Sequence, residues 1–430
     1  MTIKKKISDE LSLAPKYRKI LQDQVIDGNG PGTILHDFDI LLHHVLSGDI
    51  AASGKHHLLP AKLISEINTQ LSRPIEIDLK RPLQKSYPHI NGLYLLLRAT
   101  GLGIIEGTGR KKHIVPDDAV LESWNGLNQT EKYFALFEVW MLWGNPGIIG
   151  ERGGLYNMPQ VALPDFFQRI PEKGLKIAGN RDVEQAIPYS PGVLTLALSE
   201  LFGLISVQHA KPESGKGWRI AQVHRTPYGD AILQLVLEYS RKAGGLIRYE
   251  GEIDRTFGEL QPVIRIFFPE WRNNLVIPEP EFQEGIYIFK VSMGGIWRRI
   301  ALSGEWSFES LSDTILEAFD FDQDHLYSFI YTSRFGDTAH INHPYMDEPP
   351  FTTEILIGDL FYKPGMDMTY WYDFGDDWRF NVELERIDPM DDKIEKPLII
   401  ETHGESPEQY PVWDGEEWDD EEWDGEEWED

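Results

Sequence analysis

The chain has 430 residues, and its length and 41% apolar content predict two to four domains with packed cores. It contains no cysteine, which excludes disulfides, thiolate metal sites and cysteine nucleophiles and is typical of a reducing cytoplasm. The net charge of −29 is uneven: residues 286–430 hold 9 basic and 37 acidic side chains, and the preceding residues are nearly neutral. Because neither a secretory leader nor an apolar run of membrane-spanning length is evident, we expect a cytoplasmic protein without membrane contact.

A polar arm, residues 1–30, precedes three expected helices and a hairpin. The helices carry apolar stripes at 38–46, 63–71 and 93–97, and the strands lie at 103–105 and 113–115. Three helices followed by a hairpin are the element order of a winged helix. We therefore predict a winged-helix-like unit over residues 31–130.

Similar signals recur later in the chain. A helical stripe at 194–202 ends at Gly203, and a strand, a Lys- and Gly-rich loop and a returning strand follow up to residue 223. This order predicts a second winged-helix-like unit over residues 191–277. A helical and loop connector, residues 131–190, joins the two units, and its start (131–143) is apolar nearly all round, as in a fully buried helix. A strand is expected over residues 262–269.

From residue 286 the apolar period changes to two. Strands are expected at 286–291 and 296–302, then a helix capped by Ser307 with its stripe at 308–319, a strand at 327–331, and a hairpin pairing 368–372 with 380–384. This opening order predicts a β-grasp-like α+β domain over residues 283–412. The predicted class of the whole chain is thus α+β, with mostly helical winged-helix-like units in front of a β-grasp-like domain.

Several motifs of this last domain stand in a recognisable order. They are Ile296-Trp297-Arg298-Arg299-Ile300, His325-Leu326-Tyr327-Ser328-Phe329, the run from Tyr370 to Trp378, and the run from Gly404 to Pro411. Residues 286–411 closely resemble the plasmid pRiA4b ORF-3-like family. The resemblance implies the fold and a plasmid or mobile-element ancestry, and it implies no settled activity. The signature residues, structural or ligand-binding, are Trp297, Arg298, Arg299, His325, Tyr370, Tyr372, Asp373, Gly375, Asp376, Asp377 and Trp378.

The chain departs from this family at positions where relatives often carry histidine. Here the residues are Ser312, Tyr327 and Phe380. A metal or acid–base site that relied on those imidazoles would be missing, so the resemblance argues against a polynuclear metal site.

The acidic turn around Gly375 has two readings. Asp373, Asp376 and Asp377 could form a carboxylate site for a divalent cation or for acid–base chemistry. Alternatively, they form a tight turn in which Asp side chains cap backbone N–H groups and Gly375 adopts a positive φ, which the residue types favour. An arginine of the 297–299 motif is expected to pair with the Asp373 and Asp376 carboxylates; alternatively, the same arginine forms a site for a phosphate or carboxylate ligand.

Candidates for cofactor or metal binding are few. His340 and His343 have the best metal-ligand spacing, but they lie in a Pro-rich loop without a helix to fix them. The glycine-rich stretch 28–32 lacks the strand and the Lys-Ser/Thr of a phosphate-binding loop. No cofactor is predicted.

For nucleic acid, the third helix of each unit should enter the groove, and the wing between its strands should contact phosphate. The candidate contacts are Arg98, Arg110, Lys111, Lys112, Lys211, Lys216 and Arg219. Against this, the apolar helix at 93–97 offers few side chains to read bases. A winged helix used for packing or protein contact is equally consistent with the sequence.

The C-terminal end repeats a tryptophan every five residues. Residues 413–430 contain Trp413, Trp418, Trp423 and Trp428, and residues 414–430 hold twelve acidic side chains and no basic one. Such charge density predicts a disordered tail. It is either merely solubilising, or it folds back over a basic wing or docks on a partner protein.

These observations favour a non-enzymatic binding or regulatory protein of mobile-element ancestry, with DNA as one expected partner. The first alternative is an enzyme or a ligand- or metal-binding domain that uses the Tyr372–Asp376 region. The second is a protein-interaction scaffold.

Overall fold

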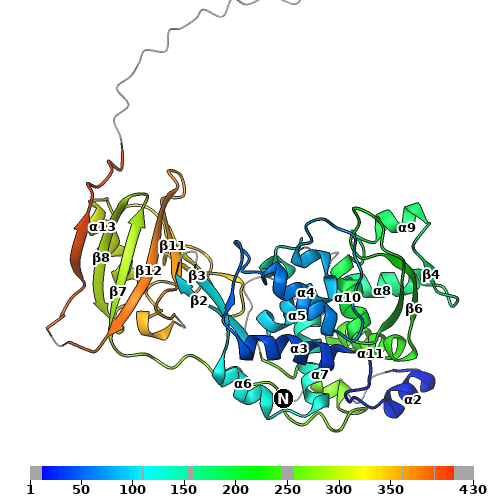
Figure 1. The fold of residues 1–430 in the computed structure, drawn as a ribbon. Coiled ribbons are helices and arrows are strands. Elements are labelled where there is room, and N and C mark those ends of the chain that lie inside the picture. Colours follow the sequence, from blue (N-terminus) through cyan, green and yellow to red (C-terminus); the bar gives the residue numbers. More distant parts are fainter. Residues whose placement is uncertain are drawn as a thin grey trace, which may run out of the picture.

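The computed structural model describes residues 12–108, 111–153, 158–243, 256–360, 362–391 and 393–410. A helical front part with two three-stranded sheets lies beside a C-terminal domain built on a seven-stranded antiparallel sheet (Figure 1). The α+β class predicted from the sequence is confirmed. Within these ranges, no helix has the length and apolar character needed to cross a membrane.

The first unit occupies residues 34–116. Its elements are, in order, α3 (Ile34–Ser47), β1 (Ile50–Ala51), α4 (Ala61–Gln70), α5 (Pro88–Ala99), β2 (Gly103–Thr108) and β3 (Lys111–Pro116). β3 lies between β1 and β2 in the sheet. Pro88 suits the first position of α5 because no intrahelical partner exists there for an N–H. Gly101, with a φ of +75°, follows the end of that helix in a conformation that favours glycine.

The second unit repeats this order over residues 159–225. It consists of α8 (Pro159–Arg169), β4 (Leu175–Lys176), α9 (Arg181–Ala186), α10 (Val193–Leu201), β5 (Ile205–His209) and β6 (Ile220–Arg225), and β6 lies between β4 and β5. The repeat therefore begins before residue 191, within the segment that the sequence assigned to the connector. One backbone contact recurs at the same place in both units: Asp117 N donates to Leu102 O, and Thr226 N donates to Leu204 O, each at 3.1 Å.

Further helices lie before, within, between and after the two units along the chain. They are α2 (Pro15–Asp23), η1 (Gln84–Ser86), α6 (Asp118–Asn125), α7 (Gln129–Glu138), the π-helical turn η2 (Val139–Trp143), η3 (Pro146–Ile149), α11 (Pro227–Ala243) and α12 (Gln261–Ile264). The predicted burial of residues 131–143 is confirmed for nearly all of them, since only Lys132 and Trp143 are partly exposed. The strand predicted at 262–269 is wrong, because Pro262 lies in the first turn of α12.

The two units meet through their third helices, α5 and α10. Every residue of α5 is buried, as are Thr195 to Leu201 of α10. The helices approach closely at Gly92, where an added Cβ would lie 2.9 Å from Cγ and Cδ2 of Leu198. The apolar stretch at 93–97 is therefore the centre of the core between the units.

The C-terminal domain begins with the hairpin of β7 (Ile286–Met293) and β8 (Ile296–Ser303), and α13 (Phe308–Phe319) packs on the sheet. The other elements are β9 (Tyr327–Thr332), β10 (Thr338–Asn342), η5 (Ile357–Asp359), β11 (Asp367–Tyr372), β12 (Trp378–Asp388) and β13 (Leu398–His403). The sheet order is β10-β9-β11-β12-β7-β8-β13. The predicted strands, hairpins and helix are confirmed, and Ser307 caps α13 by accepting a hydrogen bond from Ser310 N.

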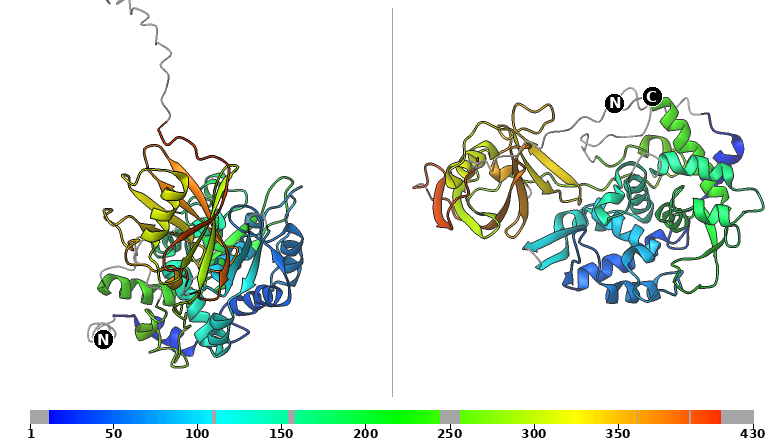
Figure 2. Two further views of the ribbon diagram at one scale, coloured as in Figure 1. Left: turned by 90° about the vertical axis from the view of Figure 1, so that its left-hand side faces the viewer. Right: turned by 90° about the horizontal axis from the view of Figure 1, so that it is seen from above.

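The C-terminal domain docks on the first unit through the turn between β9 and β10, here called the 333–337 tip. Arg334 Nη2 lies 2.5 Å from Asp117 Oδ2, and the two side chains are only 9% and 7% exposed. Arg334 Nη1 also donates to Pro278 O. Lys112 on β3 pairs with Asp367 on β11 at 2.6 Å, which holds the β2–β3 hairpin against the domain. Seen from above, the two parts of the molecule lie side by side (Figure 2).

Candidate functional site

The signature turn between β11 and β12 is organised by the backbone around Asp373. Asp373 Oδ1 accepts hydrogen bonds from Gly375 N at 3.0 Å and Asp376 N at 3.4 Å. Positive φ angles occur at Asp373 (49°) and Asp377 (57°), whereas Gly375 has none, so aspartates take the role expected of the glycine. Asp373 Oδ2 is 3.5 Å from His325 Nε2. The geometry is that of a capped turn.

The predicted arginine partner for this turn is wrong. Arg298 is buried and donates to the carbonyls of Ala318 and His403 and to Ser406 Oγ. Arg299 forms a bidentate pair with Glu385, at 2.6 and 3.0 Å, and also contacts Glu401. Both arginines thus tie β8 to neighbouring segments, and Trp297 stacks on His403 with ring centroids 5.4 Å apart. Within the described residues, neither arginine forms an ion pair with Asp373 or Asp376.

The remaining signature residues form the core and rim of the domain. Tyr370 is buried, and its hydroxyl lies 2.7 Å from Ser312 Oγ. The rings of Tyr327 and Phe380 lie 5.4 and 5.8 Å from the Tyr370 ring. The three positions where the resemblance would place histidines therefore surround one buried tyrosine. At the rim, Tyr372 donates to Asp322 O, burial raises the pKa of Tyr372 to about 12, and Trp378 packs edge-on against Phe321.

The two candidate metal ligands, His340 and His343, make separate contacts. His340 Nδ1 lies 3.3 Å from Ser328 Oγ, and His343 Nδ1 accepts from Tyr345 N. Across the residues that the structure describes, no group of three or more His, Asp or Glu side chains is arranged to hold a metal ion.

Most basic side chains proposed for nucleic acid have carboxylate partners or are buried. Lys216 pairs with Glu213 at 2.6 Å, and Arg219 pairs with Glu213 and with Glu184. Lys112 contacts Asp367 of the C-terminal domain, as described above. Lys111 and Lys211 are exposed, and Arg110 lies outside the described residues, as does the tail predicted to be disordered at 413–430.

Arg98 is the clearest correction among the nucleic-acid candidates. Its side chain is 98% buried, and Nη1 donates a long 3.4 Å hydrogen bond to Tyr94 Oη. The 333–337 tip covers it, because a Cβ at Gly336 would lie 2.8 Å from Arg98 Nη2. In this arrangement Arg98 cannot reach a phosphate.

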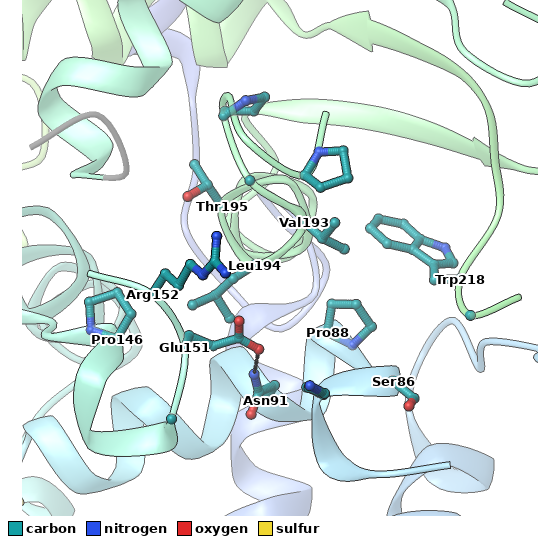
Figure 3. Close-up of a pocket in the computed structure, with 16 residues that line it drawn as sticks. Ser86, Pro88, Asn91, Pro146, Glu151, Arg152, Val193, Leu194, Thr195 and Trp218 are labelled. Carbon is teal, nitrogen blue, oxygen red and sulfur yellow. Dashed lines mark hydrogen bonds between the residues drawn. The ribbon is translucent and has the colours of Figure 1, made fainter. Parts of the chain in front are cut away.

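A pocket of about 490 Å³ opens where the two units meet (Figure 3). The starts of α5 and α10, the segment 150–152 after η3, and Trp218 before β6 form its walls. Leu194 projects toward the pocket, as do Arg152 and Glu151, and the Glu151 carboxylate accepts from Asn91 Nδ2 at 3.0 Å. Lys85 also lines the pocket. Its volume is within the range of small-ligand pockets.

A buried polar cluster lies on the other side of Trp218. Glu200 Oε2 is 2.9 Å from His89 Nε2 and 3.6 Å from His209 Nε2, and Oε1 is 2.9 Å from Arg73 Nη1. The Trp218 ring packs edge-on against both imidazoles. Burial alone raises the pKa of Glu200, but its interactions with His209 and His89 outweigh burial and lower that pKa to about 2.

Sequence reasoning singled out none of these cluster residues. One signal was present: Glu200 precedes Gly203 by three residues, as Arg98 precedes Gly101, so both third helices carry one buried charge at the same place. A charged residue inside an apolar helical stripe indicates a buried partner. Its partners lie far away in the chain: His89 is 111 residues from Glu200, and Arg73 is 127 residues from it. The sequence does not reveal such distant partners.

Comparison with known proteins bears on the C-terminal domain. Residues 286–410 match the family model described as plasmid pRiA4b ORF-3-like protein. The C-terminal domain belongs to this family. The resemblance seen in the sequence is thereby confirmed, and the segment is called the ORF-3-like domain below.

A solved structure is also similar to the chain. It is the crystal structure of a protein of unknown function, MM3350, from Methanosarcina mazei Go1, with 28% identity and a TM-score of 0.26. The match covers 29% of this chain and 72% of that chain. None of the curated proteins matches the chain.

Proposed function

We propose that this protein is a non-enzymatic binding protein of regulatory type, and that it binds a peptide segment in the pocket between its two helical units. In this proposal the units are winged-helix-like modules that serve as a protein-interaction scaffold. Their order of three helices and three strands, with the last strand between the other two, supports that assignment. The strand-strand-helix-strand opening of the ORF-3-like domain supports its assignment as β-grasp-like, and the family name supports a plasmid or mobile-element ancestry.

The observation that carries the proposal is the burial of both third helices. A winged helix reads DNA by placing its third helix in the major groove. Here α5 and α10 pack on each other at Gly92 and Leu198, which leaves neither helix a free face for a groove. The same packing creates the pocket at the start of the two helices (Figure 3).

Selection of a random peptide library on the full-length protein tests this function. Enriched peptides are expected to bind the Leu194→Trp variant about tenfold more weakly than the unmutated protein, because the indole fills the pocket. They are expected to bind the Leu194→Met variant as tightly as the unmutated protein. Circular dichroism of both variants controls for folding. Peptides that bind Leu194→Trp as well as the parent, or a library that yields no binder, would contradict the proposal.

DNA contact by the second wing is the second candidate function. It is favoured by Lys211, which is exposed in the loop between β5 and β6 and has no carboxylate partner among the described residues. In this reading the winged-helix-like unit contacts phosphates through its wing alone. Such contact would be weak and independent of sequence.

A further inference from the structure

We propose that the pocket between the units holds a tryptophan of the acidic C-terminal tail, residues 411–430 of the same chain. This inference rests on the proposed function, because it names the occupant of the same pocket. The tail would then compete with other peptides and act as an internal inhibitor of binding.

The pocket offers the surfaces that an indole ring requires. Pro88, Pro146, Pro191 and Trp218 line part of it and give it flat apolar surfaces, beside polar walls from residues such as Asn91 and Thr195 (Figure 3). An aromatic ring gains most from burial against such surfaces. The volume of about 490 Å³ accommodates one large side chain with its flanking backbone.

A basic segment of the chain leads up to Lys85, which lines the pocket. Residues 79–105 contain four cationic side chains and no acidic one. Three of the four, Lys80, Arg81 and Lys85, are exposed, and none of them has an ion pair within the described part of the chain. Arg152 and Glu151 also line the pocket, and the Glu151 carboxylate accepts a hydrogen bond from Asn91. We call residues 80–85 the basic strip.

The tail has the complementary chemistry. Residues 414–430 hold twelve acidic side chains and no basic one, and each of the four tail tryptophans has an acidic neighbour. The strip attracts the carboxylates, and the pocket takes the ring. Beyond Tyr410, twenty residues can extend to roughly 70 Å, so the later tryptophans, Trp423 and Trp428, have the longest reach.

The surface around Tyr410, where the tail begins, is acidic and repels the acidic tail. The carboxylates of Asp322, Asp324, Asp373 and Asp376 all lie close enough to act on Tyr410. Like charges repel, so the tail is driven away from its own domain toward cationic surfaces. The second wing is a poorer destination than the basic strip, because Lys216 and Arg219 already have carboxylate partners.

Fluorescence anisotropy with a labelled peptide of residues 411–430 tests the inference. The receptor is the full-length protein with its four tail tryptophans replaced by serine, so that its own tail lacks anchors. The peptide is expected to bind this receptor and to bind wild type several-fold more weakly, because the intact tail competes. Adding Lys80→Glu, Arg81→Glu and Lys85→Glu should weaken binding about tenfold, and so should Leu194→Trp. Lys62→Glu, an exposed charge reversal on α4, is the matched control and should change nothing.

Three results would overturn the inference. The first is that the tail peptide does not bind the receptor. If library peptides still lose affinity for the Leu194→Trp variant, the pocket remains a peptide-binding site, and only the tail is excluded as its occupant. The second is binding that the three charge reversals weaken while Leu194→Trp does not, which would indicate surface attraction alone. The third is equal affinity for wild type and for the serine receptor, which would show that the tail does not occupy the pocket in its own chain.

Discussion

Breaking the Arg334–Asp117 pair probes how firmly the ORF-3-like domain is docked. The atoms lie 2.5 Å apart, and the side chains are 9% and 7% exposed, so neither charge can be solvated once its partner is lost. Removing one member of a buried pair typically costs roughly 3–5 kcal/mol. For Arg334→Met we expect about 3 kcal/mol, because methionine keeps part of the apolar stem that packs in the interface. Asp117→Asn retains an oxygen for the N-cap bond from Val120 N and should isolate the charge.

A double-mutant cycle measures the pair itself. Urea unfolding of wild type, Arg334→Met, Asp117→Asn and the double variant gives the four free energies of unfolding. We expect a coupling energy of about 2 kcal/mol, since the double variant leaves no unpaired charge. A coupling below about 0.5 kcal/mol, the limit for independent sites, would refute the docking role assigned to the 333–337 tip.

Three further predictions concern the interior. Gly92→Val should lower the free energy of unfolding by about 1–3 kcal/mol, because the added Cβ lies 2.9 Å from Leu198 atoms. In urea titrations, combining it with Leu198→Ala should restore part of this loss. An unchanged loss in the double variant would contradict the close contact of α5 with α10. Glu200→Gln should cost up to about 3 kcal/mol at pH 7, because the folded-state pKa of Glu200, about 2, lies below its ordinary value of 4.5. In wild type this stability is present above pH 4.5 and is lost as the pH falls toward 2, so stability should depend less on pH in the variant over that range. Identical acid-unfolding curves for the two proteins would contradict a stabilising role of the ionised Glu200. Ser312→Ala should cost about 1–3 kcal/mol by calorimetry, because it leaves the buried Tyr370 hydroxyl without its partner, whereas the double variant with Tyr370→Phe should cost less than the sum.

Local patterns sufficed to predict the ORF-3-like domain. β12 alternates apolar and polar residues from Trp378 to Glu385, β7 begins with a run of apolar residues, and the Gly294-Gly295 turn and Ser307 mark where β7 and α13 are bounded. The start of the second unit was missed, because β4 has two residues and α9 six, too few to show a period. The strand predicted at 262–269 failed for a similar reason, since a short apolar run between prolines does not distinguish a strand from a helical turn.

Long-range pairing limited the prediction of the site. Arg299 reaches Glu385 and Glu401, which are 86 and 102 residues away, so the nearer acidic turn was the wrong partner. The apolar face of residues 93–97 already disfavoured base reading, but the identity of its partner, α10, depends on how the units pack. Sequence patterns fix which faces are apolar, and the tertiary arrangement decides what covers them.

The salt dependence of duplex DNA binding by the full-length protein tests most directly whether the buried third helices exclude groove reading. If only Lys111 and Lys211 contact phosphates, the slope of log K against log salt concentration should be about −2 or shallower, without preference for sequence. A slope of about −5 or steeper, together with sequence preference and loss of affinity in Arg98→Ala, would contradict the account, because it would require a third helix to leave the core and enter DNA.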